Sequence, residues 1–214
     1  MKLGILIPYY KNSEACELYF KKLMKTLEKQ VGGNIELIIC EDGQVSSWLH
    51  NYNFPIIVSF DENKGVAITR NELLDLARLY KYDYIMFLDS DDMIDCDFIG
   101  KMYTKACTLE YDMIISRFIY NKKEMVYPKR SNVAGICLRA KFIEGLSFDE
   151  DYLISEDTIF INEVYDRKPL IGEVDSNYYY NYGVNENSLM KRFERSEIKI
   201  KKDKDEQVMV SDKK

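Results

Sequence analysis

Short apolar runs alternate with stretches of helical periodicity along the first half of the chain. Runs of about five apolar residues that end in polar turns are typical of strands buried in a parallel sheet. They predict strands at 3–7, 35–40, 56–60, 84–88 and 113–118. Apolar residues recurring every three or four positions predict helices at 13–27, 66–80 and 95–109, the first capped by Asn12 or Ser13. This alternation predicts an α/β fold with a mostly parallel central sheet flanked by helices.

The second half of the chain is less regular, and its pattern indicates a different kind of unit. A polar loop is expected over 120–132, a strand over 133–138, a short helix over 139–145, a helix over 155–166 and a tyrosine-rich strand over 178–182. We expect residues 1–190 to form a single domain. Residues 191–214 carry dense mixed charge without Gly or Pro, which predicts a solvated helix or tail.

Composition and charge narrow the class of protein. The chain has 214 residues, of which 46% are hydrophobic, which is ample for one core. With 30 basic and 36 acidic residues the net charge is −6, which disfavours a nucleic-acid polymer as partner. No signal peptide or transmembrane segment is evident, because no apolar run approaches about 18 residues. Five scattered cysteines indicate reduced thiols, so we expect a cytoplasmic protein, with or without peripheral attachment to a membrane.

The acidic turn Asp89-Ser90-Asp91-Asp92 is the strongest chemical signal, because ligands of such sheets bind beyond the carboxyl ends of the strands. Asp89 and Asp91 are two residues apart and are expected to face one cavity. Two adjacent carboxylates repel each other unless a cation relieves them, and hard divalent cations bridge carboxylates to phosphates. The alternative is that these acids only end a strand and cap the next helix. Asp92 and Asp95 are interpreted as such caps.

Three weaker signals each have two interpretations. A carboxylate of Glu41 or Asp42 is suited to bind a base or ribose, or belongs to an ordinary turn. Arg70 follows a turn at 63–65 and is either a phosphate-binding fork or a surface arginine. Glu156 and Asp157 open a helix whose positive end is expected to lower the pKa of an acid there. They suit a general base for an alcohol, or they are simply acids that the helix dipole favours.

Taken together and in order, these motifs resemble the family 2 inverting glycosyltransferases of the GT-A fold over residues 3–190. The resemblance is carried by Ile5-Leu6-Ile7-Pro8-Tyr9-Tyr10, Cys40-Glu41-Asp42-Gly43, Asn63-Lys64-Gly65 with Arg70-Asn71, Phe87-Leu88-Asp89-Ser90-Asp91-Asp92, Ser155-Glu156-Asp157-Thr158-Ile159-Phe160, and Tyr178-Tyr179-Tyr180-Asn181-Tyr182 with Asn187-Ser188. The Asp-Ser-Asp-Asp piece, with its spacing to the Glu-Asp pair, is the most specific of them.

The resemblance implies an enzyme that moves a hexosyl or N-acetylhexosaminyl group from a nucleotide-diphosphate sugar, with UDP favoured, to an acceptor hydroxyl. It implies a Rossmann-like nucleotide-sugar-binding half at 1–118 and an acceptor half with the catalytic base at 119–190. The implied nucleotide-sugar site comprises Pro8, Tyr10, Glu41, Asp42, Asn63, Gly65, Arg70, Asp89, Ser90 and Asp91. Within that site, Glu41 or Asp42 would hold the base of the nucleotide and Arg70 would face the phosphates.

The same resemblance assigns the chemistry. Asp91, with Asp89 beside the ribose, would hold Mn²⁺ or Mg²⁺ on the diphosphate. Asp157 would be the catalytic base, and Glu156 would orient the acceptor or support the helix start. The acceptor, whether glycan, lipid-linked or protein, is not implied.

The chain departs from the family pattern in two places. Glu41-Asp42 replaces the two aspartates of many members, and the only histidine, His50, is far from the late position that supplies a metal ligand. Two other functions are weighed. A nucleotidyltransferase would need a Gly-rich loop after the first strand, and residues 8–12 contain no Gly. A non-catalytic sugar-nucleotide or glycan-binding module would be expected to lose the aspartates, which are present.

Overall fold

The computed structural model describes residues 1–120, 122–125, 129–180 and 193–194. Its strands form one nine-stranded sheet. They are β1 (Leu3–Tyr9), β2 (Ile35–Glu41), β3 (Pro55–Ser59), β4 (Tyr84–Phe87), β5 (Met93–Ile94), β6 (Met113–Tyr120), β7 (Lys123–Met125), β8 (Cys137–Arg139) and β9 (Ile171–Tyr180). The helices are α1 (Glu14–Leu27), the 3₁₀ turn η1 (Leu49–Asn51), α2 (Val66–Leu79), α3 (Phe98–Thr108) and α4 (Glu156–Asp166).

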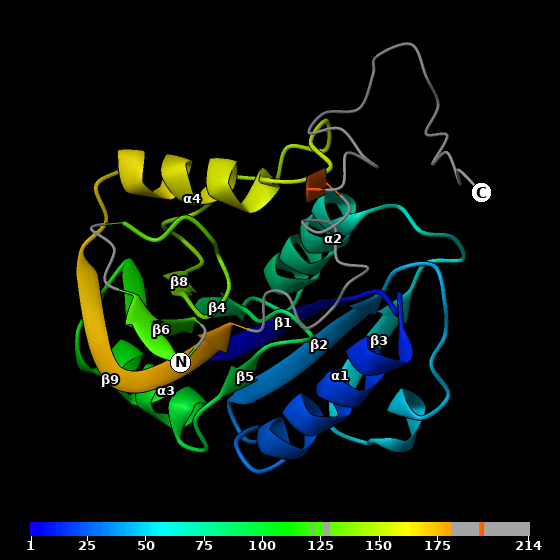
Figure 1. Ribbon diagram of the computed structural model, residues 1–214. Coiled ribbons are helices and arrows are strands. Elements are labelled where there is room, and N and C mark those ends of the chain that lie inside the picture. The colour runs from blue at the N-terminus through cyan, green and yellow to red at the C-terminus, as the bar shows by residue number, and fades with distance from the viewer. Residues whose placement is uncertain (121, 126–128, 181–192, 195–214) are drawn as a thin grey trace.

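The strand order is β3-β2-β1-β4-β8-β6-β9-β5, with β7 paired to β6. The first four strands are parallel, as predicted. Beyond β4 the sheet is mixed, because β8 runs antiparallel to both β4 and β6, and β5 runs antiparallel to β9. Figure 1 shows β9 curling around this second half of the sheet. The expected α/β sheet flanked by helices is confirmed; pairing is all parallel among β1 to β4, and in the second half only β6 and β9 pair in parallel among the described strands.

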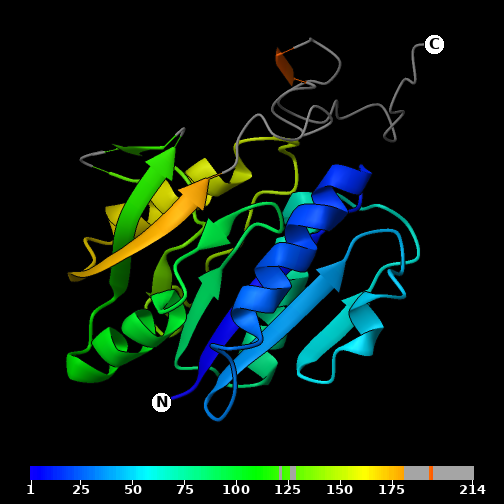
Figure 2. The same cartoon turned by 60° about the horizontal axis from the view of Figure 1, so that its bottom comes forward.

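Each face of the sheet is covered by two helices. The alternation of side chains along β1 places Leu3 and Ile5 against α1 and α3, whereas Leu6 packs on the α2 and α4 side. Figure 2 shows α1 lying along the sheet beside β1 and β2. The helix begins as predicted, since the Ser13 hydroxyl accepts a hydrogen bond from the Cys16 amide.

Several predicted elements of the second half differ from the structure. The segment 120–132, predicted to be a loop, contains β7, which forms a hairpin with β6. The predicted strand at 133–138 is reduced to the short β8, and the predicted helix at 139–145 is a series of turns. The two-residue strand β5 was not predicted, and α3 begins at Phe98 rather than near 95. The tyrosine-rich strand is confirmed as the end of β9, although it begins earlier, and residues 181–182 lie outside the described residues.

The first four strands bring their carboxyl ends to one edge of the sheet, where the acidic turns after β2 and β4 lie. Among the described residues, no helix is long and apolar enough to cross a membrane. The predicted C-terminal helix or tail falls outside the described residues, apart from 193–194.

Candidate functional site

The turn after β4 carries the two carboxylates that were predicted to act together. The Leu88 amide donates to the Leu6 carbonyl at 3.0 Å, so β1 supports the chain up to the residue before Asp89. The side chain of Asp89 is 25% exposed, and Asp91 is half-buried. Burial and the charge of Asp89 raise the pKa of Asp91 to about 6. The two carboxylates are therefore close enough to repel each other, which is the electrostatic setting a cation relieves.

Arg70 connects this turn to the start of α4. Its Nη2 atom donates to Asp89 Oδ1 at 2.9 Å, and Nη1 donates to Glu156. The guanidinium carbon lies 5.5 Å from the centre of the Phe148 ring. Although burial disfavours its charge, Asp89, Glu156 and Asp157 outweigh that effect and raise the pKa of Arg70 further. Sequence analysis offered a phosphate fork or a surface arginine, whereas the structure places a buried arginine between two carboxylates. A direct contact with phosphate stays a prediction.

The start of α4 presents Glu156 and Asp157 in different surroundings. Glu156 is buried, and burial raises its pKa against the opposing effect of Arg70. Asp157 is half-exposed, and its Oδ1 atom accepts from the Thr158 amide at 2.8 Å. Burial also raises the pKa of Asp157, again opposed by Arg70. The expected lowering by the helix dipole is therefore wrong in direction, because desolvation exceeds it.

The helix was predicted to open at Ser155, whereas α4 begins at Glu156 and Ser155 lies just before it. The residue has φ of 66°, in the left-handed region, and its side chain makes no capping hydrogen bond. A non-glycine residue in this region is strained by roughly 1 kcal/mol or more. The turn at Ser155 sets the direction in which the chain enters α4. Glu156 thereby points to Arg70 while Asp157 remains accessible.

Glu41 and Asp42, the two candidates for binding a nucleotide base, both hold loops. Glu41 is fully buried and accepts from the Ser46 amide at 2.6 Å, the Ser59 hydroxyl at 3.0 Å and His50 Nε2 at 3.0 Å. These contacts tie β3 and η1 to the end of β2. The side chain of Glu41 therefore has a structural role that sequence reasoning missed, because its partners are up to 18 residues away.

Asp42 connects the turn after β2 to the loop that opens α2. Its carboxylate accepts from the amides of Lys64 at 2.7 Å and Gly65 at 3.0 Å. Burial raises its pKa, opposed by these two amides. Gly43 is required here, because its φ is +83° and a β-carbon would lie 2.3 Å from the Asn63 nitrogen. The structure thus brings the predicted Glu-Asp-Gly and Asn-Lys-Gly turns together.

The remaining predicted nucleotide-sugar residues lie at or near the same edge. Pro8 is half-buried in β1, and Tyr10 just after β1 is 45% exposed. Asn63 is exposed, and Ser90 is buried in the acidic turn. Their contacts with a nucleotide sugar stay predictions.

Tyr180, at the end of β9, lies near the candidate site and was not assigned a role from the sequence. Burial and then the charges of Asp89, Asp92 and Asp91 raise the pKa of its hydroxyl, and Asp157 adds to this effect. Its hydroxyl therefore lies within electrostatic range of the carboxylates on both the β4 and α4 sides. The only signal in the sequence was the run of tyrosines itself.

Asp92 and Asp95, which were interpreted as helix caps, instead bind residues of β9. Asp92 accepts a hydrogen bond from the Tyr178 hydroxyl. Asp95 lies three residues before α3 and accepts from the Asn177 amide at 2.8 Å. The cap interpretation is wrong for both side chains, because their partners come from a strand more than 80 residues later in the chain.

The carboxylates, the buried arginine and the two glycine turns all lie in the part of the chain that matches a known family. A family model described as glycosyl transferase family 2 matches residues 4–172. The chain belongs to this family. The resemblance found from the motifs is thereby confirmed.

Individual glycosyltransferases are similar over part of their length. Glycosyltransferase GlyA of Streptococcus pneumoniae is 24% identical over 133 residues, which are 59% of this chain and 18% of GlyA. Glycosyltransferase GlyG of the same organism is 26% identical over 129 residues, covering 57% of this chain and 40% of GlyG. The matched region thus spans less than half of these relatives.

Solved structures share the fold. S. aureus TarS, residues 1–349, in complex with UDP-GlcNAc superposes with a TM-score of 0.70 at 18% sequence identity. The match covers 84% of this chain and 58% of that one. At this identity the similarity establishes the GT-A type of fold, and the ligand belongs to TarS.

The residues of the acidic turn fit a divalent metal shared with a ligand. Asp89 and Asp91 supply hard carboxylate oxygens, which Mg²⁺ and Mn²⁺ prefer. Within the described ranges no group of three or more His, Cys, Asp or Glu side chains could hold a metal. Mg²⁺ is commonly bound by one or two carboxylates together with substrate phosphates and water, so two suffice.

Proposed function

We propose that this chain is a metal-dependent inverting glycosyltransferase that moves a sugar from a UDP-sugar to an acceptor hydroxyl. One observation carries the proposal. Arg70 binds Asp89 from the acidic turn and Glu156 from the start of α4, so these two segments are held together although they are 67 residues apart. The arrangement places a pair suited to metal and diphosphate beside Asp157, which is suited to accept a proton.

The chemistry requires two tasks of this chain. Asp91 and Asp89 would hold Mn²⁺ or Mg²⁺, which supplies positive charge for the diphosphate that leaves. Asp157 would accept the proton of the acceptor hydroxyl while that oxygen bonds to the anomeric carbon from the face opposite the leaving group. The bond from the anomeric carbon to the diphosphate oxygen breaks in the same displacement, so one base suffices and the configuration inverts.

Arg70 has a supporting part in this scheme. Its positive charge favours the ionised form of Asp157, against the burial that raises the pKa of that carboxyl. The ion pairs of Arg70 also fix where the Asp89 and Glu156 carboxylates lie. Such preorganisation is a large part of electrostatic catalysis.

The choice of UDP rests on similarity, because TarS, which shares the fold, has been solved with UDP and with UDP-GlcNAc. A cytoplasmic location is part of the same proposal, since all five cysteines are free thiols.

The test is incubation of the full chain with a panel of UDP-, GDP- and dTDP-sugars and Mn²⁺, with nucleotide release as the readout. Release of UDP that requires Mn²⁺ and is lost in Asp157→Asn supports the proposal. Binding of UDP-sugars without release, in the presence of a broad panel of acceptors, would instead indicate a binding module. Formation of a nucleotide sugar and pyrophosphate from UTP and a sugar phosphate would indicate a nucleotidyltransferase.

A further inference from the structure

Tyr178 on β9 is a fully buried tyrosine directly beneath the acidic turn. Its hydroxyl donates a hydrogen bond to the carboxylate of Asp92. The amide of Asp89 approaches the same hydroxyl at 3.5 Å, at the long end of hydrogen-bond distances. One oxygen atom therefore contacts both ends of the segment that contains Asp91.

The hydroxyl remains a donor under all ordinary conditions. Burial, together with the charges of Asp92 and Asp89, raises the pKa of Tyr178 well above its usual value near 10.

The ring of Tyr178 has little freedom to move. A β-carbon on Gly135, whose φ is +71°, would lie 2.5 Å from Cδ2 of the ring, so the backbone there is in close contact with it. The Phe118 ring stacks on it with centres 6.1 Å apart and planes 15° apart, and Phe98 packs on it at 6.2 Å. The Gly135 amide also donates to the Phe87 carbonyl at 2.8 Å, just before the acidic turn. The position of the hydroxyl is consequently fixed by the core.

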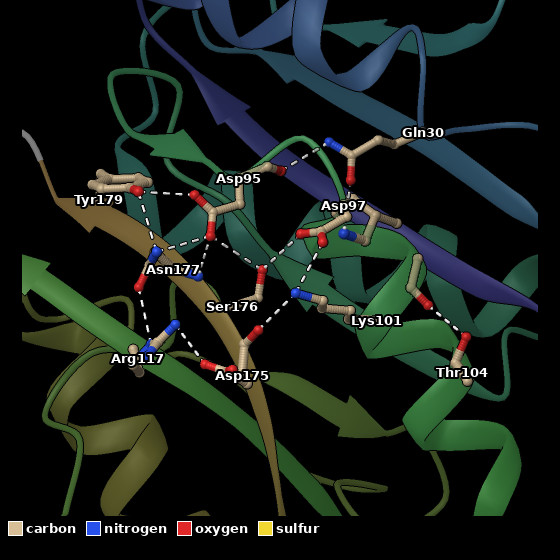
Figure 3. Close-up of polar contacts among 12 residues, drawn as sticks. Gln30, Asp95, Asp97, Lys101, Thr104, Arg117, Asp175, Ser176, Asn177 and Tyr179 are labelled. Carbon is tan, nitrogen blue, oxygen red and sulfur yellow. Dashed lines mark hydrogen bonds and ion pairs between the residues drawn. The ribbon is translucent and has the colours of Figure 1, made fainter.

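Asn177 and Tyr179, on either side of Tyr178 in β9, both donate hydrogen bonds to Asp95, as Figure 3 shows. Asp95 accepts from the amide and the side chain of Asn177, at 2.8 and 2.9 Å, and from the Tyr179 hydroxyl at 2.8 Å. These contacts lock the antiparallel pairing of β5 with β9, in which Ile94 faces Tyr178. The end of the acidic turn is thus attached to β9 through Asp92, and the segment just after β5 is attached through Asp95.

We propose that Tyr178 is a positioning residue that holds the turn from Asp89 to Asp92 in the conformation that binds the metal and the donor diphosphate. The inference rests on the proposed function and extends it to a residue that touches no substrate. A misplacement of carboxylates by a few tenths of an ångström weakens a metal site, because ligand distances are narrowly defined.

A purely structural role makes a different prediction. If the hydroxyl only satisfies a buried carboxylate, its removal lowers stability and leaves the affinity of the folded protein for donor unchanged. If the hydroxyl positions the turn, donor affinity falls more than it does for another buried tyrosine that loses an equivalent hydrogen bond. Tyr84 on β4 provides this control, since it is also buried and its hydroxyl donates to the Tyr111 carbonyl at 2.7 Å.

The experiment compares Tyr178→Phe with Tyr84→Phe in the full chain. UDP binding is measured by calorimetry in Mn²⁺, and melting temperatures are measured alongside. We expect both variants to melt below the wild type. We expect UDP affinity to fall about fivefold to tenfold in Tyr178→Phe, which corresponds to about 1–1.4 kcal/mol and lies within the range for one hydrogen bond. It should change less than about twofold in Tyr84→Phe. Equal UDP affinities in the two variants would overturn the inference.

A second variant tests the same hydrogen bond in case Tyr178→Phe does not fold. Asp92→Ala removes the acceptor while keeping the tyrosine, and it is expected to weaken UDP binding in the same way. If Tyr178→Phe cannot be recovered folded, wild-type UDP affinity in Asp92→Ala overturns the inference. Absence of UDP binding to the wild type, by contrast, contradicts the proposed function itself and is seen before any variant is made.

Discussion

Replacement of Arg70 by methionine tests the buried ion pairs that join the two sides of the site. Arg70→Met keeps the length of the side chain and removes its charge, which leaves Glu156 only 5% exposed without a cation. Asp89 is 25% exposed and can be hydrated. Most of the cost of leaving a carboxylate without its cation therefore arises at Glu156. The buried carboxyl escapes desolvation by taking up a proton.

The free energy needed to protonate Glu156 sets the size of the expected loss of stability. Protonating a carboxyl of ordinary pKa about 4.3 costs about 3.7 kcal/mol at pH 7 and about 1 kcal/mol at pH 5. The positive end of α4 offsets up to about 1 kcal/mol at neutral pH. Because loss of Arg70 raises the folded-state pKa of Glu156 further, the added penalty grows as pH rises above the unfolded value and vanishes as pH falls. Burial already raises this pKa in the wild type, so part of the cost is present there. We therefore expect a loss of about 1–3 kcal/mol at pH 7, which corresponds to about 2–12 °C in melting temperature for a chain of this size.

Urea denaturation at pH 7 and pH 5 measures this difference. Arg78→Met is the matched control, because Arg78 lies on the same helix and pairs with Asp75, the two side chains being 46% and 68% exposed. An exposed pair is worth about 0–1 kcal/mol, with little change between the two pH values. A loss in Arg70→Met no larger than in the control, or a loss that is equal at pH 5 and pH 7, would refute the reasoning.

Three further outcomes are expected. Asp91→Ala should fold normally and lose most UDP affinity in Mn²⁺; calorimetry with and without chelator checks this, and unchanged binding would remove the metal from the proposal. Asp157→Asn should lower turnover about 10²–10⁴-fold with donor affinity nearly unchanged, which steady-state kinetics and calorimetry separate. Gly135→Ala should lower the melting temperature more than Gly145→Ala, because φ is positive at both but only at Gly135 would the added carbon meet the Tyr178 ring; equal shifts would contradict this packing.

The sequence predicted the first four parallel strands because each is a short, mainly apolar run; β1, β2 and β4 are largely buried, and β3 at the edge of the sheet is half-buried. It did not predict β5 or β7, which are two and three residues long and have no periodicity to detect. The strand expected at 133–138 is interrupted at Gly135, whose positive φ makes a turn. Whether an isolated glycine in an apolar run breaks a strand depends on what packs against it, here Tyr178.

The candidate site was predictable as a set of acidic turns at strand ends, but the partners of those acids were not. Arg70 and Glu156 are 86 residues apart, and nothing in the local pattern around either indicates that they meet. The same holds for Asp92 and Tyr178, also 86 residues apart. Sequence patterns predict on which strand, helix or turn a polar side chain lies. The order of the strands β8, β6 and β9 decides which of those groups become neighbours.

The pairing of β5 with β9 has a consequence for how the protein folds. The parallel strands β1 to β4 pair with one another within residues 3–87, whereas the turn after β4 is completed by a strand that begins at residue 171. Folding can begin during synthesis, before the later part of the chain is available. During synthesis, the N-terminal half can therefore be compact while its acidic turn still lacks β9. Competence to bind a donor is expected to arise in the last stage of folding.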